Sequence, residues 1–271
     1  MDHHAPTLGV SLDIARMVEH RDWILESNRD VELRDPSYPE TLDNGWRPLV
    51  EKARSLLDGH TGRLGVHGPF WNLTTAARDS LVRNAVVDRL RQGLQFAAEV
   101  GATHMVIHSP FAYLGANPFT PYSPGPKLDE EISVAHETLR EVLPLAEENG
   151  CTLVMENIYD TNPRPLITLV KSFDSELVRL SVDTGHAFIA HRLGGPPPDQ
   201  WVREAGDMLH HLHLQDTDGN ADRHWEPGDG SVNWFAVFEA LSELDHDPRL
   251  ILEVDGPVRG AEWLRSRNLA T

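Results

Sequence analysis

HLHLQDTDGNADRHWEPGDG, residues 210–229, joins a strand-like segment to a loop that is rich in metal-binding side chains. His211 and His213 alternate with leucines, as on a strand whose faces have different surroundings. Asp222 and His224 follow in a stretch rich in glycine and aspartate, which is typical of a loop. We expect the strand to supply one metal ligand, His213, and the loop to fold back and supply two more. The glycines of the loop allow the positive φ angles that such a return needs.

Segments of the same kind recur along the whole chain. Short apolar or β-branched runs occur at 8–14, 30–34, 63–68, 104–109, 152–158, 179–185, 209–215 and 250–256. Helical periodicity lies between them, most clearly at 81–101, at 131–150, where Pro144 predicts a kink, and at 232–244. Eight alternating units in 271 residues predict an α/β fold of one domain, residues 1–271, built as a closed (β/α)8 or TIM barrel. No GxGxxG motif follows the first strand, which argues against a dinucleotide-binding fold.

The composition limits the partners of the protein. Its 42 acidic and 24 basic residues give a net charge of −18, so we expect no affinity for nucleic acid. The first ten residues lack the features of a signal peptide, and no segment approaches the roughly 18 apolar residues of a membrane span. These features predict a soluble, cytoplasmic protein without a membrane partner. Cys151, the one cysteine, opens an apolar run and is expected to be buried.

Polar residues follow the apolar part of six strands. In a parallel barrel these C-terminal strand ends form the active face. Imidazole and charged groups among apolar residues are costly unless they are paired or bound to metal. The groups are His67, His108, Glu156, Asp183, His213 and Glu253, with His186 three residues after Asp183. Any one of them could be a satisfied core residue, but six at one barrel mouth favour a metal centre.

Asp222 and His224 complete a set of five histidines and four carboxylates. Mixed nitrogen and oxygen ligands suit Zn²⁺ or Mn²⁺ better than Ca²⁺ or Mg²⁺. The charge of about −4 on the carboxylates offsets two or three divalent cations, and we expect one to three ions per chain. His211 should lie one layer below His213, as a support for the ligands or a core residue, and His210 should point outward.

These residues lie in sequence blocks that resemble the xylose isomerase-like TIM barrels. That family joins sugar phosphate isomerases and epimerases with AP endonuclease family 2, the endonuclease IV type. The blocks, in the family's order, are MEN, VDTGHAF, HLHLQD, DRHWEPGDGSVNW and LEV. The resemblance implies a single-metal site of the isomerase type, formed by Glu156, Asp183, His213 and Glu253. It also implies that the two glutamates of this site act as the acid/base pair. It further implies that the other positions of the endonucleases' three-zinc site are filled by His67, His108, His186, Asp222 and His224.

Two chemistries follow from this resemblance. A sugar or sugar phosphate could be isomerised or epimerised by proton transfer through a metal-stabilised enediolate, with Glu156 and Glu253 as acid and base. Alternatively, three zinc ions could hydrolyse a phosphodiester, as in an AP endonuclease. The acidic surface favours a small sugar or polyol as the substrate. A metal-binding barrel without enzymatic activity is the least expected, because both glutamates are present.

Side chains near the ligands are candidates for substrate contact. Phe70 and Trp71 follow His67 and suit the apolar face of a sugar ring, although one of them could instead pack under the loop. Arg223 could meet a phosphate, as could Arg164 or Arg192, and each could equally be an ordinary surface arginine. The long segment 109–126 could form a lid that carries Tyr113, Phe119 and Tyr122, or be only a variable loop. A homo-oligomer is a fair expectation for such a barrel.

Overall fold

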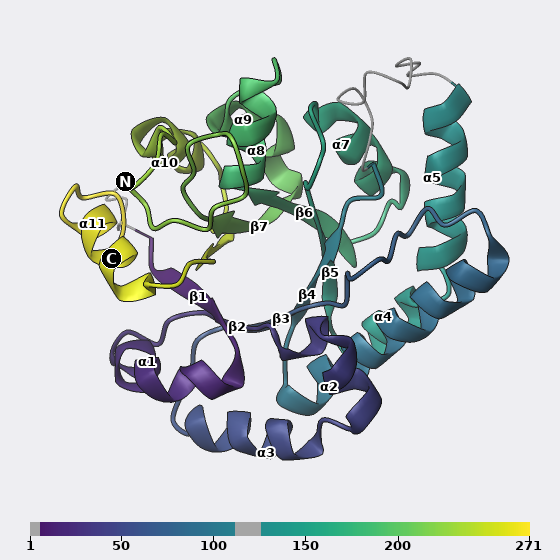
Figure 1. The fold of residues 1–271 in the computed structure, drawn as a ribbon, viewed down its shortest axis with the longest axis horizontal. Coiled ribbons are helices and arrows are strands. Elements are labelled where there is room, and N and C mark those ends of the chain that lie inside the picture. Colours follow the sequence, from purple (N-terminus) through teal and green to yellow (C-terminus); the bar gives the residue numbers. More distant parts are fainter. Residues whose placement is uncertain (1–5, 112–125) are drawn as a thin grey trace.

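In the computed structural model, described for residues 6–111 and 126–271, eight parallel strands close into a barrel (Figure 1). Each strand pairs with the next along the chain, and the eighth pairs with the first. The strands are β1 (Leu8–Leu12), β2 (Val31–Leu33), β3 (Leu64–His67), β4 (His104–His108), β5 (Thr152–Glu156), β6 (Val178–Asp183), β7 (Leu209–Leu214) and β8 (Arg249–Leu252). Every segment predicted as a strand overlaps one, and the predicted (β/α)8 barrel is confirmed.

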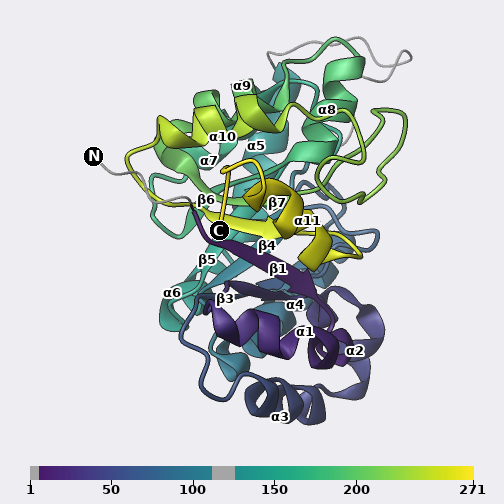
Figure 2. The same cartoon turned by 90° about the vertical axis from the view of Figure 1, so that its left-hand side faces the viewer.

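Helices surround the barrel on its outside (Figures 1 and 2). They are α1 (Ile14–Glu26), α2 (Pro39–Asn44), α3 (Arg47–Leu56), α4 (Ser80–Val100), α5 (Pro126–Leu139), α6 (Leu143–Glu148), α7 (Pro163–Ser172), α8 (Thr184–Arg192), α9 (Pro198–Ala205), α10 (Trp234–Ser242) and α11 (Pro257–Arg265), with short 3-10 turns η1 (Asp35–Ser37) and η2 (Gly206–Met208). The helices bury the outer face of the strands, and this explains the nearly continuous apolar runs in the sequence. Among the described residues, none of the helices is both long and apolar enough to cross a membrane.

Local signals set the helix ends. The Asp79 side chain accepts the backbone N–H groups of Leu81 and Val82 at the start of α4, and Gly101 ends that helix at a φ of 81°. The prediction of one kinked helix at 131–150 was wrong in this detail. Two helices, α5 and α6, occupy the segment, and Pro144 stands in the first turn of the second. Proline lacks the N–H that the interior of a helix needs, and it is tolerated at a helix start.

Alternation along the strands sends every second side chain into the barrel. On β7, His211 and His213 are fully buried, whereas the neighbouring His210 is half-buried, with its ring 5.7 Å from that of His246. The interior is unusually polar for a parallel barrel, where branched apolar residues normally dominate. Ser11 and Glu32 also lie within it and are fully buried. The fold therefore places polar groups both at the mouth and below it.

Strand register brings several predicted ligands side by side. His108 on β4 stands beside Glu156 on β5, and Asp183 on β6 stands beside His213 on β7. These pairs lie at the C-terminal ends of their strands. Because parallel strands all end at the same rim, the remaining ligands need only short loops to reach the same place.

Candidate metal centre

A cavity of about 590 Å³ opens at the C-terminal ends of the strands. Asp183 and His213 are fully buried, and each offers a ligand atom within 4.8 Å of those of Glu156 and Glu253, which line the cavity. The structure therefore brings together the nine residues that the sequence proposed as metal ligands. Seven of the nine line the cavity, namely His67, His108, Glu156, His186, Asp222, His224 and Glu253.

Three carboxylates surround one imidazole in the central cluster, which consists of Glu156, Asp183, His213 and Glu253. Each of these residues offers one ligand atom within 4.8 Å of the others. The Nδ1 atom of His213 lies 3.1 Å from Glu156 Oε1 and 3.4 Å from Glu253 Oε2. Three buried carboxylates repel one another unless a cation lies among them. The donor set therefore fits a divalent metal ion.

Ionisation in the central cluster reflects the same excess of negative charge. Burial raises the pKa of Asp183 to about 6. Burial alone would lower the pKa of the His213 imidazole, but the carboxylates around it raise that pKa well above its usual range. In addition, Glu156 Oε2 is buried and has no hydrogen-bond partner among the described residues. A metal ion would satisfy this oxygen and supply the positive charge directly.

A second cluster shares Glu156 and adds His67 and His108. The two Nε2 atoms of the histidines lie 3.4 Å apart, and they lie 3.8 and 3.9 Å from Glu156 Oε2. His67 Nδ1 lies 3.0 Å from the carbonyl oxygen of Gly68, which can only accept a hydrogen bond. His67 Nδ1 is therefore the donor to this carbonyl, and its Nε2 atom faces the cluster. Burial lowers the pKa of His108 to about 3, so the His108 ring is neutral at physiological pH.

The third cluster consists of His186, Asp222 and His224. Asp222 Oδ2 lies 3.3 Å from His186 Nε2 and 3.1 Å from His224 Nε2. His186 Nδ1 donates to the carbonyl oxygen of Asn157, and His224 Nδ1 donates to that of Glu253, both at 2.9 Å. A backbone acceptor thus orients each ring and directs Nε2 to the site, as metal-binding histidines require.

The loop after β7 is held in place by two residues that the sequence reasoning missed. Gln215 donates to Asp222 Oδ1 at 2.7 Å and accepts the backbone N–H of His224 at 2.9 Å. Asp216 is fully buried and accepts the backbone N–H groups of Gly228 and Val232 and the indole N–H of a nearby tryptophan. As expected, glycines in the loop have positive φ: Gly219 has 77° and Gly228 has 96°. His224 itself has a φ of 49°.

Glu32 on β2 is a third residue that was missed, and it supports the central cluster from below. Its Oε1 accepts from His213 Nε2 at 2.8 Å and from Ser11 Oγ at 3.0 Å. The Nε2 proton of His213 is thereby fixed, and Nδ1 is left to face the metal site. The available signal was an acidic residue in the middle of a short, otherwise apolar strand.

The predicted substrate contacts have different surroundings. Phe70 and Trp71 line the cavity with their rings stacked 5.0 Å apart, and Phe70 also stacks on His108 at 4.4 Å. Trp71 is 52% exposed, so its face is available. Arg223 is not among the residues that line the cavity, and it pairs with Asp218 at 3.2 Å. The predicted lid residues Tyr113, Phe119 and Tyr122 lie outside the described residues.

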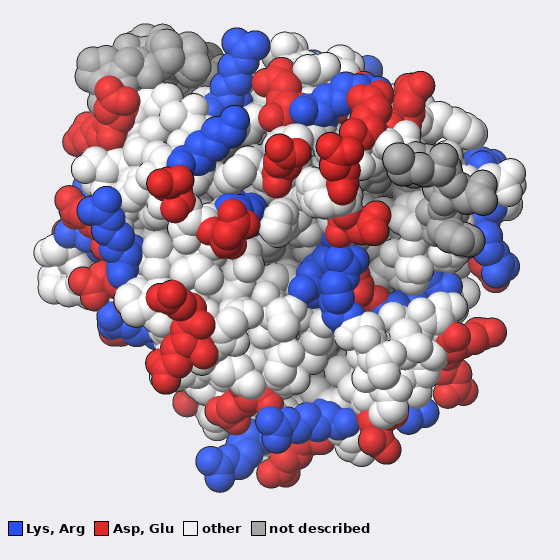
Figure 3. Space-filling model, turned by 180° about the vertical axis from the view of Figure 1, so that it is seen from behind, with Lys and Arg blue, Asp and Glu red and all other residues white. Residues whose placement is uncertain are grey.

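Basic residues are scarce in the cavity wall and scattered over the visible surface. Arg34 is the only arginine or lysine among the described residues that line the cavity, and it is paired with Asp13 at 3.1 Å. Figure 3 shows the opposite face from Figure 1, where Lys and Arg side chains are interspersed with Asp and Glu. Neither the cavity wall nor the described surface visible in Figure 3 presents the continuous basic stripe of a nucleic-acid-binding protein.

Known proteins with similar sequences and structures include several epimerases. An uncharacterized protein of Methanocaldococcus jannaschii is 27% identical over 75% of this chain and 68% of its own length. The D-psicose 3-epimerase of Enterocloster bolteae is 31% identical over 44% of this chain and 38% of its own. The crystal structure of a D-tagatose 3-epimerase-like protein matches with a TM-score of 0.76, 24% identity and 96% coverage of both chains.

A fourth similar protein has been crystallised and exposed to a metal salt. A Thermus thermophilus protein whose crystals were soaked with zinc chloride matches with a TM-score of 0.70 and 27% identity, over 96% of both chains. Finally, the sequence profile described as "Xylose isomerase-like TIM barrel" matches residues 26–267, which is most of the chain. Together with the eight-stranded barrel and its buried histidine and carboxylate clusters, this match shows that the chain belongs to the xylose isomerase-like TIM barrel family.

Proposed function

We propose that this protein is a divalent-metal-dependent isomerase or epimerase of a sugar or sugar phosphate. The central cluster carries the proposal, because it combines a metal-type donor set with two carboxylates that reach the cavity, Glu156 and Glu253. The similar proteins named as D-psicose 3-epimerase and D-tagatose 3-epimerase-like protein support a keto-sugar as the substrate class.

The central cluster would hold one Zn²⁺ or Mn²⁺ ion. A bound ion would supply Lewis acidity that polarises the substrate carbonyl. His213 would bind through Nδ1, because Glu32 accepts the proton on Nε2. Asp183 also accepts the backbone N–H of His186 at 2.6 Å at the start of α8, which fixes the position of the carboxylate.

Proton transfer would involve the two glutamates. Glu156 ends β5 and Glu253 follows β8, so they approach the cavity from positions three strands apart. One carboxylate would take the proton from the carbon next to the carbonyl, which leaves an enediolate, and the other would return a proton to the carbon. Phe70 and Trp71 would contact the apolar face of the sugar.

The test is exchange of a substrate hydrogen with solvent. Metal-loaded protein would be incubated with a panel of keto-sugars and their phosphates in deuterated water. We expect deuterium at the carbon beside the carbonyl, detected by NMR. If no sugar of the panel exchanges with the fully metal-loaded protein, the proposal loses its basis.

Phosphodiester hydrolysis is the second candidate, and the two additional clusters favour it. His67 and His108, and also His186, Asp222 and His224, are arranged so that two more ions could bind beside the central one. The single, paired arginine of the cavity wall disfavours a nucleic-acid substrate. Metal-dependent incision of duplex DNA at an abasic site would reverse this ranking, and we expect none at physiological salt.

A further inference from the structure

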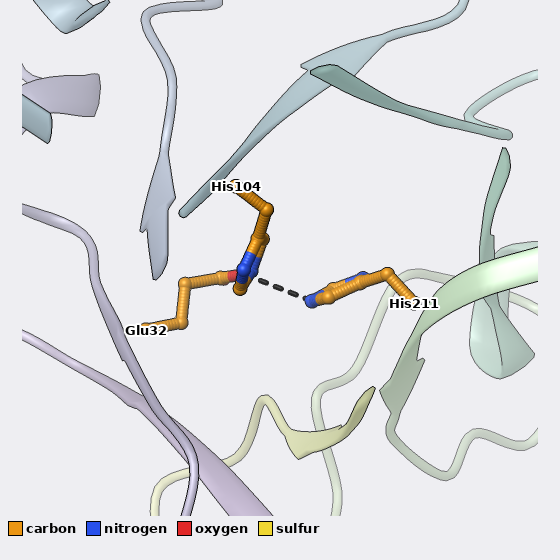
Figure 4. A group of neighbouring side chains, drawn as sticks. All are labelled: Glu32, His104 and His211. Carbon is orange, nitrogen blue, oxygen red and sulfur yellow. Dashed lines mark ion pairs between the residues drawn. The ribbon is translucent and has the colours of Figure 1, made fainter. Parts of the chain in front are cut away.

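A second group of ligand-type side chains lies inside the barrel, below the central cluster. It consists of Glu32 on β2, His104 at the start of β4 and His211 on β7 (Figure 4). These side chains come from three separate strands and point toward one another. Glu32 and His211 are fully buried, and His104 is 2% exposed. The proposed reaction uses neither histidine.

The contacts within this group are short, but they are not hydrogen bonds. Glu32 Oε2 lies 2.9 Å from His211 Nε2 and 3.5 Å from His104 Nε2. Despite these distances, none of the three atoms has a hydrogen-bond partner among the described residues. Native structures rarely leave buried polar atoms without a hydrogen-bond partner, because such atoms lose their contacts with water and gain nothing in return. Three unpaired atoms that face one another therefore require an explanation.

Ligation of one ion accounts for this geometry. Atoms that bind the same zinc ion, each about 2.0–2.2 Å from it, lie roughly 3–3.5 Å apart in a four-coordinate site. Their lone pairs point at the ion and not at one another, so short separations occur without hydrogen bonds. The two separations from Glu32 Oε2 agree with this pattern.

The charges of the group also suit a cation. Glu32 has only imidazoles within ion-pairing distance among the described residues. Arg249, a nearby arginine, donates instead to the Leu64 carbonyl at 3.3 Å and to Thr103 Oγ1 at 2.6 Å. The Glu32 carboxylate therefore has no arginine or lysine partner among the described residues, although a buried charge is costly unless it is paired or bound to a cation.

The surrounding residues leave room for the two rings and orient them. A Cβ atom at Gly65 on β3 would overlap the ring of His104, so the absence of a side chain there admits the ring. Ser181 on β6 is hydrogen-bonded to His211 Nδ1 at 2.8 Å, which leaves His211 Nε2 directed at Glu32. His104 also lines a cavity of about 340 Å³, whereas Glu32 and His211 do not.

We propose that Glu32 Oε2, His104 Nε2 and His211 Nε2 bind one zinc-type divalent cation in a closed site inside the barrel. Two histidines and one glutamate are a known zinc donor set, and a water molecule would complete the coordination. The ion joins β2, β4 and β7. Because Glu32 Oε1 also accepts from His213, the inner site is linked to the central cluster through one carboxylate.

Anomalous scattering tests the site directly in the wild-type protein. Crystals of the zinc-loaded full chain would be measured on both sides of the zinc absorption edge. We expect a zinc peak about 2 Å from all three ligand atoms, in addition to any peak at the mouth. Zinc peaks at the mouth with none inside the barrel would overturn the proposal and leave a network of side chains alone.

Zinc stoichiometry provides a second test that does not depend on catalysis. After dialysis against zinc, His104→Leu should retain one ion fewer per chain than the wild type. His210→Leu is the matched control, because His210 lies on β7 but belongs neither to the inner group nor to the clusters at the mouth, and it should retain the wild-type number. Equal stoichiometry in all three proteins would contradict the inner site. If His104→Leu does not fold, the anomalous map of the wild type decides.

Discussion

His213 shows how single residues organise this centre, since its two ring nitrogens have different partners. Nε2 donates to Glu32 at 2.8 Å, and Nδ1 faces Glu156 at 3.1 Å. The rings of His67, His186 and His224 are oriented through Nδ1 by backbone carbonyls. Each imidazole therefore has one nitrogen bound to the protein and one available to a metal, which lowers the entropic cost of assembling the site.

Replacing His213 tests whether the central cluster binds the ion. His213→Ala removes one of four ligands, and we expect metal affinity to fall by about 10²-fold or more. His210→Ala changes the adjacent, outward residue of the same strand and should leave the affinity unchanged. Competition with a chromophoric chelator measures both variants. Equal affinities would show that the ion does not depend on His213.

The two glutamates allow proton transfer to be separated from ligation. Glu156→Gln and Glu253→Gln each keep an oxygen that can bind metal, but an amide cannot act as a general base. We expect solvent exchange of the substrate's carbon-bound hydrogen to fall by about 10²-fold or more at full metal occupancy. Glu262→Gln, on the exposed face of α11, is the control. If the fully metallated variants exchange this hydrogen at the wild-type rate, both glutamates serve only as metal ligands.

At the scale of elements, the segment from β7 to α10 depends on Asp216. This buried carboxylate accepts three N–H groups from residues 12 to 18 positions later in the chain. It thereby closes the loop that carries Asp222 and His224 into the third cluster. The loop has no regular structure, and these side-chain hydrogen bonds replace the backbone pairing of a sheet or helix.

Asp216→Asn should destabilise this element. The amide replaces one acceptor oxygen with a donor that faces N–H groups, so we expect a loss of about 1–3 kcal/mol in the free energy of unfolding. Urea unfolding of the metal-free protein measures the change. Asp229→Asn removes only an exposed pairing with Arg259 and should cost less than about 1 kcal/mol. Similar losses in both variants would mean that Asp216 does not organise the loop.

At the scale of the whole molecule, barrel closure brings the ligands together. They come from six consecutive strands, β3 to β8, and from the loops that follow them. The closed sheet also holds several carboxylates close to one another. Their repulsion adds to that of a chain with a net charge of −18. Bound cations should therefore contribute to the stability of the fold.

Chelation should lower the thermal unfolding midpoint. A ligand present at 100 times its dissociation constant stabilises the native state by about 2.7 kcal/mol. We expect EDTA treatment to lower the midpoint by several degrees, and added Zn²⁺ or Mn²⁺ to restore it. Ca²⁺ should restore less, because imidazole is a poor ligand for it. Differential scanning calorimetry measures the midpoint, and a value insensitive to chelation would contradict a metal role in stability.

Local pattern was sufficient to predict the strands and to propose the nine candidate ligands. Apolar runs mark buried parallel strands, and a polar residue at the C-terminal end of such a strand is placed at the barrel mouth by the fold itself. His213 could be placed at the mouth in this way without any structure, and Asp222 could be proposed as a ligand from the loop that follows. The same reasoning could not separate α5 from α6, because a proline near a helix end has the same local signature as a kink.

Contacts between distant strands were decided only by the tertiary structure. Glu32 lies on a strand of three residues and is 181 positions from His213, so no local periodicity indicated that its side chain points inward. Arg34, and not Arg223, lines the cavity for the same reason, since the direction of a loop side chain depends on its packing. Periodicity reports which residues share a face, whereas closure of the barrel decides which faces meet.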